Sequence, residues 1–234
     1  MRRAQQVKAT LFAMLLLSAL APLATAAETD PLEGFNRKID AFNQFGDRWL
    51  IRPAAVTYRT LMPEVVDQGV TNMFNNVREP ITIVNDLLQF KFKKAGADTG
   101  RLLLNSTVGL LGFFDVAAKA GLPRQVEDFG QTLGYWGVPA GPYVVIPLLG
   151  PSNLRDAFGQ IPDAFANPIA YIDDDLPRFS ALSLYYVDLR ADIIDVEGLI
   201  SGDQYVFVRD AYLQDREYLV KDGAVVDDFG DEDF

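Results

Sequence analysis

The side chains in this sequence that could do chemistry are mainly carboxylates and serines. Three consecutive carboxylates, Asp173 to Asp175, could bind a hard cation such as Ca²⁺ or Mg²⁺, as a metal-dependent lipase would need. Adjacent side chains point in different directions on any regular backbone, so an acidic, solvated loop is the better interpretation. A serine nucleophile at Ser106 or Ser152 would need a neighbouring base, and the chain has no His to serve as one.

The missing residue types exclude several classes of site. The sequence contains no Cys and no His, which rules out Cys–His nucleophiles, Ser-His-Asp triads, haem ligation by His and the usual zinc sites. Asp188, Asp192 and Asp195 have the spacing of one helical face and are interpreted as its solvated side. We therefore expect a protein that is not an enzyme, with no catalytic residue, no metal site and no cofactor.

The first 26 residues have the features of a cleaved secretory signal peptide. Arg2, Arg3 and Lys8 accompany an apolar stretch, which ends at Pro22 before the A-x-A site at 24–26. Cleavage would change the net charge from −11 to −14, because three cations and no acid are lost. So acidic a chain is unsuited to nucleic acid, and any attachment to a membrane must come from apolar surface. No other apolar run is long enough to span a bilayer.

A repeated pair of residues stands near the start of the mature chain. Phe35-Asn36 and Phe42-Asn43 lie seven positions apart in DPLEGFNRKIDAFNQFGDRW, residues 30–49. This segment opens with a helix-capping signal at Asp30, and its apolar residues recur with helical spacing. Taken alone, the pattern favours an ordinary amphipathic helix packed on a core.

Hydrophobic periodicity predicts helices through most of the remaining chain. Pro80 is expected to separate two of them, because Pro interrupts a helix. The Gly- and Pro-rich segment 127–159 is predicted to be a long irregular loop, with a short extended piece at 143–146. The predicted fold class is all-α, with one domain over 27–220 and an acidic, disordered tail over 221–234. The expected helices cover residues 65–77, 81–88, 102–114, 182–200 and 205–219.

Five segments together resemble the MlaA/VacJ family. They are DPLEGFNR, FNNVREPITIVNDLLQ, RLLLNSTVGLLGFFDVA, EDFGQTLGYWGVPAGPYVVIPLLGPSNLRD and YVFVRDAYLQ, and they occur in the family's order with similar spacing. The resemblance runs from about Asp30 to about Leu219, which is nearly the whole mature chain. Each segment is weak evidence alone, but five in register are specific.

The resemblance implies a single ring-like bundle of amphipathic helices in the inner leaflet of the Gram-negative outer membrane, with a channel through it. Misplaced phospholipids would pass from the outer leaflet to a soluble periplasmic carrier, and a trimeric porin would be a further partner. Phe42 and Asn43 would take part in gating, with the rings on one side and the amides toward a headgroup path. The hinge loop beside the channel would contain Gly137, Pro139, Gly141 and Tyr143.

Two features depart from the family pattern. Most members are lipoproteins with an N-terminal Cys, whereas this chain has no Cys and its leader ends in Ala26-Ala27. Pro139 stands where members often carry Gly, and Pro restricts the backbone. The expected location is therefore the periplasmic face of the outer membrane without a lipid anchor, or alternatively the soluble periplasm. The alternative function is a structural porin-associated protein that moves no lipid.

Overall fold

Helices make up most of the chain that the structure describes, as predicted. The computed structural model describes residues 30–200 and 202–224. The predicted signal peptide at 1–26 and the end of the predicted tail, 225–234, lie outside the described residues. The longer elements are α2 (Glu33–Gly46), α3 (Arg52–Leu61), α4 (Glu64–Leu88), α5 (Phe92–Thr107), α8 (Leu154–Ala166), α9 (Asp175–Asp192) and α10 (Gln204–Val220). The shorter ones are the π-helix η1 (Asp47–Ile51), α6 (Val116–Lys119), α7 (Phe129–Tyr135), β1 (Tyr143–Ile146), β2 (Gly150–Asn153), and the 3₁₀ turns η2 (Pro168–Tyr171) and η3 (Glu197–Leu199).

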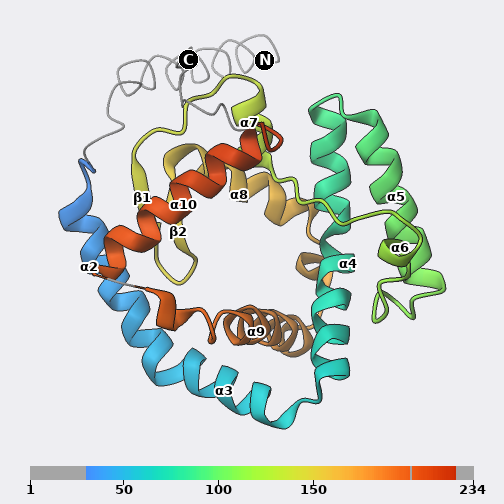
Figure 1. Ribbon diagram of the computed structural model, residues 1–234, viewed down its shortest axis with the longest axis horizontal. Coiled ribbons are helices and arrows are strands. Elements are labelled where there is room, and N and C mark those ends of the chain that lie inside the picture. The colour runs from blue at the N-terminus through green and yellow to red at the C-terminus, as the bar shows by residue number, and fades with distance from the viewer. Residues whose placement is uncertain (1–29, 201, 225–234) are drawn as a thin grey trace, which may run out of the picture.

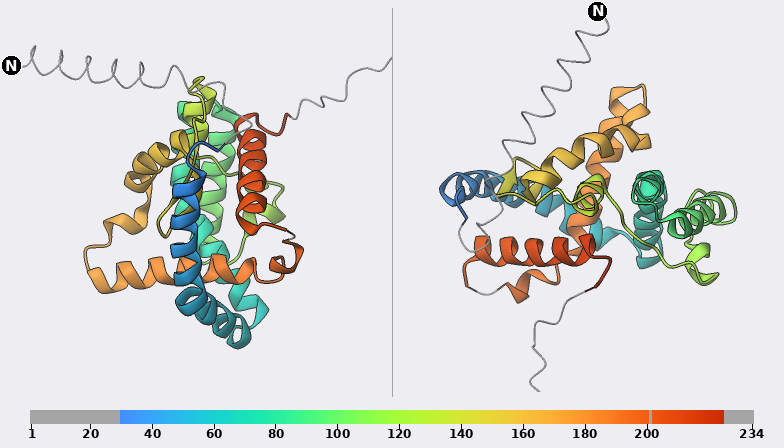
Figure 2. Two further views of the ribbon diagram at one scale, coloured as in Figure 1. Left: turned by 90° about the vertical axis from the view of Figure 1, so that its left-hand side faces the viewer. Right: turned by 90° about the horizontal axis from the view of Figure 1, so that it is seen from above.

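The helices are arranged in a ring (Figure 1). α2, α3 and α4 follow one another around it, α9 lies inside the curve that α3 and α4 form, and α8, α10 and the two strands complete the circuit. α5 and α6 lie outside the ring against α4, and α10 and α8 lie on opposite sides of the ring plane (Figure 2). The arrangement agrees with the expected ring-like bundle.

The first and last long helices close the ring. Arg37 on α2 forms an ion pair with Asp203 (Nη2–Oδ2 2.8 Å), and its guanidinium lies 4.5 Å from the centroid of the Tyr205 ring. The Tyr205 hydroxyl in turn donates a hydrogen bond to Asp30. Asp30 also accepts a hydrogen bond from the backbone N–H of Leu32, but the N-cap of α2 is Leu32 itself and not the predicted Asp30. Contacts between segments far apart in sequence therefore complete the circuit.

The Pro80 break is a wrong prediction, because α4 runs through this residue without interruption. α5 packs beside α4 on both sides of the proline. Asn76 Nδ2 donates to Ser106 Oγ (2.9 Å), and Glu79 forms a buried ion pair with Arg101 (3.1 Å). Both of these contacts lie before the proline, and after it Asp86 on α4 lies beside Asp98 on α5. A proline inside a helix costs about 3 kcal/mol, and packing against α5 on both sides offsets that cost.

The helix predicted over 102–114 is shorter than its apolar pattern suggests. α5 ends at Thr107, and Leu110 and Leu111 have φ values of +53° and +59°, which no α-helix accommodates. The Asn105 side chain stabilises the reversal that follows. Its amide donates to Asp115 (3.0 Å) and its carbonyl oxygen accepts from the N–H of Ala117 (2.9 Å). Those bonds fold the start of α6 back against α5.

The predicted loop at 127–159 contains more regular structure than its composition indicates. It includes α7, the start of α8 and an antiparallel hairpin in which β1 pairs with β2, so the extended piece at 143–146 does have a partner. Helices α7 and α8 approach closely at two glycines, since a Cβ on Gly159 would lie 2.5 Å from the Gly130 nitrogen. Irregular backbone is kept at 122–128 and 136–142.

The acidic face predicted on α9 is only partly solvated. Asp192 and Asp195 are exposed, as expected, but Asp188 is buried. It accepts hydrogen bonds from the Tyr58 hydroxyl (3.1 Å) and from Thr71 Oγ1 (3.0 Å). The prediction was wrong at Asp188 because α3, α4 and α9 meet there, and only a tertiary contact shows that. The helix itself ends at Asp192, before the predicted end at 200.

Polar side chains dominate the interior of the described chain. More polar or charged residues than hydrophobic ones are buried, and many large apolar side chains are exposed, among them Trp49 (70%), Leu61 (72%) and Leu176 (80%). The hydrophobic core is reduced to two small clusters, centred on Tyr58 and on Tyr143. Of the helices in the described ranges, none is long and apolar enough to cross a membrane.

Candidate functional site

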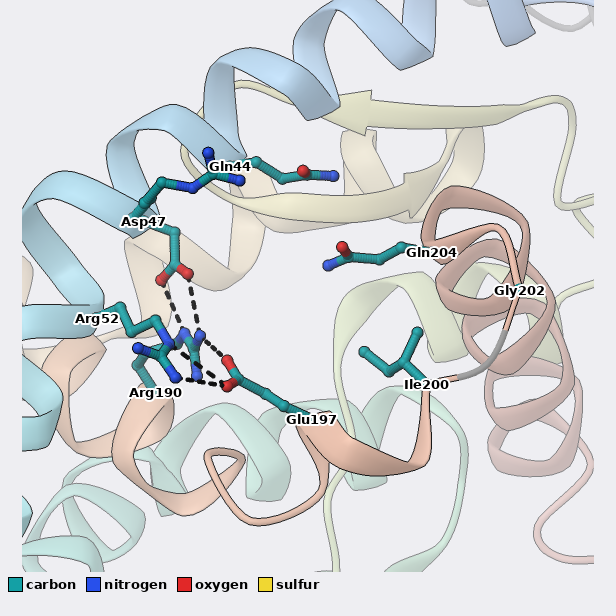
Figure 3. Close-up of a pocket in the computed structure, with 9 residues that line it drawn as sticks. Gln44, Asp47, Arg52, Arg190, Glu197, Ile200, Gly202 and Gln204 are labelled. Carbon is teal, nitrogen blue, oxygen red and sulfur yellow. Dashed lines mark hydrogen bonds and ion pairs between the residues drawn. The ribbon is translucent and has the colours of Figure 1, made fainter.

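A charged cleft opens on the inner side of the ring, where η1 faces the end of α9 (Figure 3). Its volume is about 510 Å³. Figure 3 shows Gln44 and Gln204 on opposite walls with their amides directed into the space between them. The lining residues are Gln44, Asp47, Arg48, Arg52, Arg190, Glu197, Ile200, Gly202 and Gln204.

The π-helix η1 positions two charged side chains of the cleft. The N–H of Arg52 donates to the carbonyl of Asp47, five residues earlier, which is the hydrogen bond of a π turn. One such turn places residues five apart above one another, so Asp47 and Arg52 project to the same side of the helix. Single π turns inside helices occur frequently at functional sites.

Two carboxylates and two guanidinium groups form a continuous network at the base of the cleft (Figure 3). Arg190 binds Asp47 through two hydrogen bonds, Nε–Oδ1 at 2.7 Å and Nη2–Oδ2 at 3.0 Å, and also binds Glu197. Arg52 Nη2 lies 3.2 Å from Glu197 Oε2. The network joins η1 and α3 to α9 and η3, so it fixes this wall of the ring.

The pKa shifts of Arg190 and Glu197 favour the charged form of each side chain. Hydrogen bonds to Asp47 and Glu197 raise the pKa of Arg190 despite its partial burial. Burial alone would raise the pKa of Glu197, but hydrogen bonds from Arg190 and Arg52 bring that pKa below its usual value.

Arg48 differs from the other arginines of the cleft. It is exposed, and within the described part of the chain it forms no ion pair. The two carboxylates of the lining are already bound to Arg52 and Arg190. Three guanidinium groups against two carboxylates leave one positive charge in excess on the lining.

The repeated asparagines bind the β-hairpin. Asn36 Nδ2 donates to the carbonyl of Tyr143 (3.0 Å) and its Oδ1 accepts from the N–H of Val145 (3.0 Å). Asn43 repeats the pattern with the carbonyl of Ile146 (3.0 Å) and the N–H of Leu148 (2.8 Å). The two amides thus take the place of a neighbouring strand along β1. They are directed at this backbone and not into an open path, while Phe42 beside them is 54% exposed.

The predicted hinge residues have separate local roles in the structure. Gly137 has φ +87° and follows α7, where the bonds Val138 N–H to Leu133 O and Gly137 N–H to Gly134 O end the helix as a glycine C-cap does. Gly141 has φ +69°, and Pro139 between them is exposed. Tyr143 is a buried residue of β1 that packs against Tyr205. The first three share one irregular segment, and Tyr143 lies just beyond it.

The alternative chemical sites are placed as follows. Asp173, Asp174 and Asp175 are exposed, and no metal-binding group of three or more carboxylates occurs among the described residues. Ser106 accepts a hydrogen bond from Asn76, and the buried Ser152 donates to the carbonyl of Asn153. Neither serine has a base beside it in these contacts.

Comparison with known proteins identifies the family. The family model described as MlaA lipoprotein matches residues 28–219. The chain belongs to the MlaA family. It is 35% identical over 203 residues to the intermembrane phospholipid transport system lipoprotein MlaA of Escherichia coli K12, covering 84% of this chain and 80% of that protein. The protein of the same name from Haemophilus influenzae is 32% identical over 204 residues, covering 85% and 82%.

A solved structure supports the same assignment. It comes from work on the structural basis for maintenance of bacterial outer membrane lipid asymmetry, and it matches with a TM-score of 0.73 and 34% identity over 82% of this chain and 100% of that one. The predicted membership of the MlaA family and the all-α fold class are therefore confirmed. Membership of a phospholipid transport family also confirms the prediction that the protein is not an enzyme.

The residues of the cleft were not predicted from the sequence. One signal was present: Arg48 and Arg52 flank the apolar run Trp49 to Ile51, which places two cations close together in a chain that is acidic as a whole. Their convergence with Arg190 and Glu197 depends on the π turn and on the docking of α9. Neither feature has a pattern that can be read along the chain.

Proposed function

We propose that this MlaA-family chain carries phospholipids through its ring, from the outer leaflet of the outer membrane to a periplasmic carrier, and so maintains lipid asymmetry. The observation that supports this most directly is the contrast between its surfaces. Charged and amide side chains line a cleft on the inner side of the ring, whereas large apolar side chains are exposed elsewhere. A lipid needs both a polar route for its headgroup and apolar surroundings for its acyl chains.

The location and partners are part of the same proposal. The chain has no Cys, so the acyl anchor carried by related lipoproteins would be replaced by exposed apolar side chains such as Trp49, Leu50 and Leu176. The protein would lie at the periplasmic face of the outer membrane, beside a trimeric porin. The alternative location is the soluble periplasm.

Gating is assigned to α2 and the hairpin that it holds. Phe42 and Asn43 occupy neighbouring positions, with one side chain exposed and the other bonded to β1. The segment 136–142 leads into the same hairpin and would serve as the hinge through Gly137 and Gly141. A movement of α2 would therefore be transmitted to the hairpin.

A complementation experiment tests transport against the structural alternative. A strain without its own MlaA gene would express this chain or no chain, and phospholipid exposed on the outer leaflet would be measured by its accessibility to added phospholipase. We expect the chain to lower the exposed phospholipid, together with restoration of detergent resistance.

A charge-reversed variant gives the control for this experiment. Arg52→Glu places a carboxylate beside Glu197 and breaks the network, so it should abolish the restoration while the protein is still exported and recovered with the porin. If porin association alone restores asymmetry in this variant, the structural role is the better account.

A further inference from the structure

The lining of the cleft has one positive charge with no ion-pair partner among residues 30–200 and 202–224, within a chain of strongly negative net charge. Arg52 and Arg190 are bound to Asp47 and Glu197, and Arg48 is the third guanidinium. Two carboxylates lie next to the lining. Asp203 is bound to Arg37 by two hydrogen bonds of 2.8 and 3.3 Å, and Asp40 accepts a hydrogen bond from the Gln44 amide (2.7 Å). None of these acids forms an ion pair with Arg48.

The donors of the cleft suit an oxyanion. Arg48 offers a guanidinium group whose planar fork matches phosphate oxygens. Nη1 of Arg190 is buried and has no hydrogen-bond acceptor among the described residues. The amides of Gln44 and Gln204 face one another across the same space (Figure 3). The Gln44 nitrogen donates to Asp40 (2.7 Å), so its carbonyl oxygen and the Gln204 amide are the groups that can bind the hydroxyls of a polyol.

We propose that this cleft is a binding site for the phosphodiester of an anionic phospholipid headgroup, with Arg48 contacting the phosphate. The inference rests on the proposed transport function and adds a substrate preference to it. A headgroup that ends in glycerol brings one net negative charge, which matches the one positive charge in excess. A headgroup that ends in an ammonium would need a carboxylate of the lining, and the two that the lining contains, Asp47 and Glu197, are both bound by arginines.

Binding to the purified full chain in detergent tests the site. The probes are dihexanoyl phosphatidylglycerol, dihexanoyl phosphatidylethanolamine and inorganic phosphate, each titrated calorimetrically. We expect the phosphatidylglycerol to bind more tightly than the phosphatidylethanolamine, and Arg48→Gln to weaken its binding roughly tenfold or more, because a hydrogen bond to a charged group is removed. Arg48→Lys keeps the charge and should weaken phosphatidylglycerol binding less than Arg48→Gln does.

Lys38→Gln is the matched control. Lys38 is also exposed, also carries one positive charge and lies on α2, but it is not part of the cleft lining. It should leave binding unchanged, whereas a general effect of net charge would weaken binding equally in both variants and would overturn the proposal. Inorganic phosphate bound as tightly as the phosphatidylglycerol would mean a site for free phosphate, which also overturns it. Circular dichroism of each variant checks folding.

The failure of this inference can be told apart from a failure of the transport proposal. If Arg48→Gln binds both lipids as the unaltered chain does, while the unaltered chain restores asymmetry in the deletion strain, only the headgroup site is wrong. If the unaltered chain does not restore asymmetry, transport is wrong whatever the titrations give, and the preference for an anionic headgroup falls with it.

Discussion

Individual buried acids give this chain an unusual response to pH. Asp86 on α4 and Asp98 on α5 are both fully buried, and none of their four carboxylate oxygens has a hydrogen-bond partner among the described residues. Burial first, and then the adjacent Asp98, raise the pKa of Asp86 to about 8. The pKa of Asp98 is also raised, chiefly by burial. With one proton between them, one carboxyl can donate to the other, which satisfies the pair.

The sign of the stability change follows from this shift. An unfolded Asp has a pKa of about 4, so the folded state holds the proton more tightly. The stabilisation is complete below about pH 4 and is lost as the pH rises through about 8. We predict that the Tm of the protein falls between pH 5 and pH 8.5, measured by calorimetry in detergent.

Asp86→Asn should reduce this dependence. The Asn amide can donate to Asp98 at any pH. We therefore expect the free energy of unfolding of the variant at pH 8.5 to exceed that of the unaltered chain by about 1–3 kcal/mol, which is the cost of an unsatisfied buried group. Some slope remains, because burial also raises the pKa of Glu79 to about 7 and of Asp163 to about 6. Asp173→Asn, at an exposed position, is the control. If the Tm of Asp86→Asn depends on pH as strongly as that of the unaltered chain, Asp86 and Asp98 do not share a proton.

At the scale of elements, α2 and the β-hairpin behave as one unit. The asparagines at 36 and 43 lie two helical turns apart, and each bonds the carbonyl of one residue and the N–H of the residue two further on. This spacing holds the hairpin only while the helix between the two amides keeps its phase. A change in the length of α2 between the two asparagines would therefore break their hydrogen bonds to the hairpin.

Deleting Phe42 and Asn43 would change that phase. Removal of two residues rotates the part of α2 before the deletion by about 200° relative to the part after it, and it takes away both hydrogen bonds of Asn43. We expect misregulated lipid flow, dominant over a normal copy, measured as outer-leaflet phospholipid in a merodiploid strain. A recessive loss of function would instead favour the interpretation of these residues as ordinary packing.

The hinge proposal predicts a specific effect of Gly137→Ala. Gly137 has φ +87° and nothing lies within 4 Å of its would-be Cβ, so the substitution fits sterically but costs about 1 kcal/mol of backbone strain. We expect lower lipid transport in the complementation assay. Gly121→Ala is matched to it, since Gly121 has φ +86° and equally open surroundings but lies after α6, away from the hairpin. Equal transport in the two variants would contradict the hinge.

The elements that could be predicted from the sequence are those whose pattern is local. The α2 helix, the piece at 143–146 and α10 follow from caps and periodicity. The continuity of α4 through Pro80 and the burial of Asp188 could not be predicted, because both depend on helices brought together only in the folded chain. The asparagine repeat was visible, but its use as a substitute strand required the position of the hairpin.

The molecule as a whole separates its charge from its apolar surface. Ion pairs such as Glu79–Arg101 and Asp156–Arg216 lie in the interior, while large apolar side chains remain exposed. Each 100 Å² of apolar surface that enters lipid contributes about 2.5 kcal/mol. A modest area of lipid contact therefore suffices to hold a chain whose net charge gives no attraction to an anionic surface.

Fractionation tests the proposed membrane attachment. We predict that the mature chain stays with the outer-membrane fraction after a wash in high salt and is released by detergent, because salt screens charges but does not weaken apolar contact. A periplasmic protein of known solubility serves as the control for the wash. Recovery of most of the chain in the soluble periplasmic fraction, with porins intact, would leave the soluble alternative.

The closure of the ring by Asp30, Arg37, Asp203 and Tyr205 also sets the order of folding. Arg37 and Asp203 are 166 residues apart in the chain and Asp30 and Tyr205 are 175 apart. Contacts of such long range form slowly, because a large loop must lose its freedom before any of them is made. When the chain is exported with its N-terminus first, the start of α2 therefore has no partner until α10 has also been exported. Throughout that interval its apolar side chains are open to aggregation, and an escort that shields them would be needed more than by a protein with a local core.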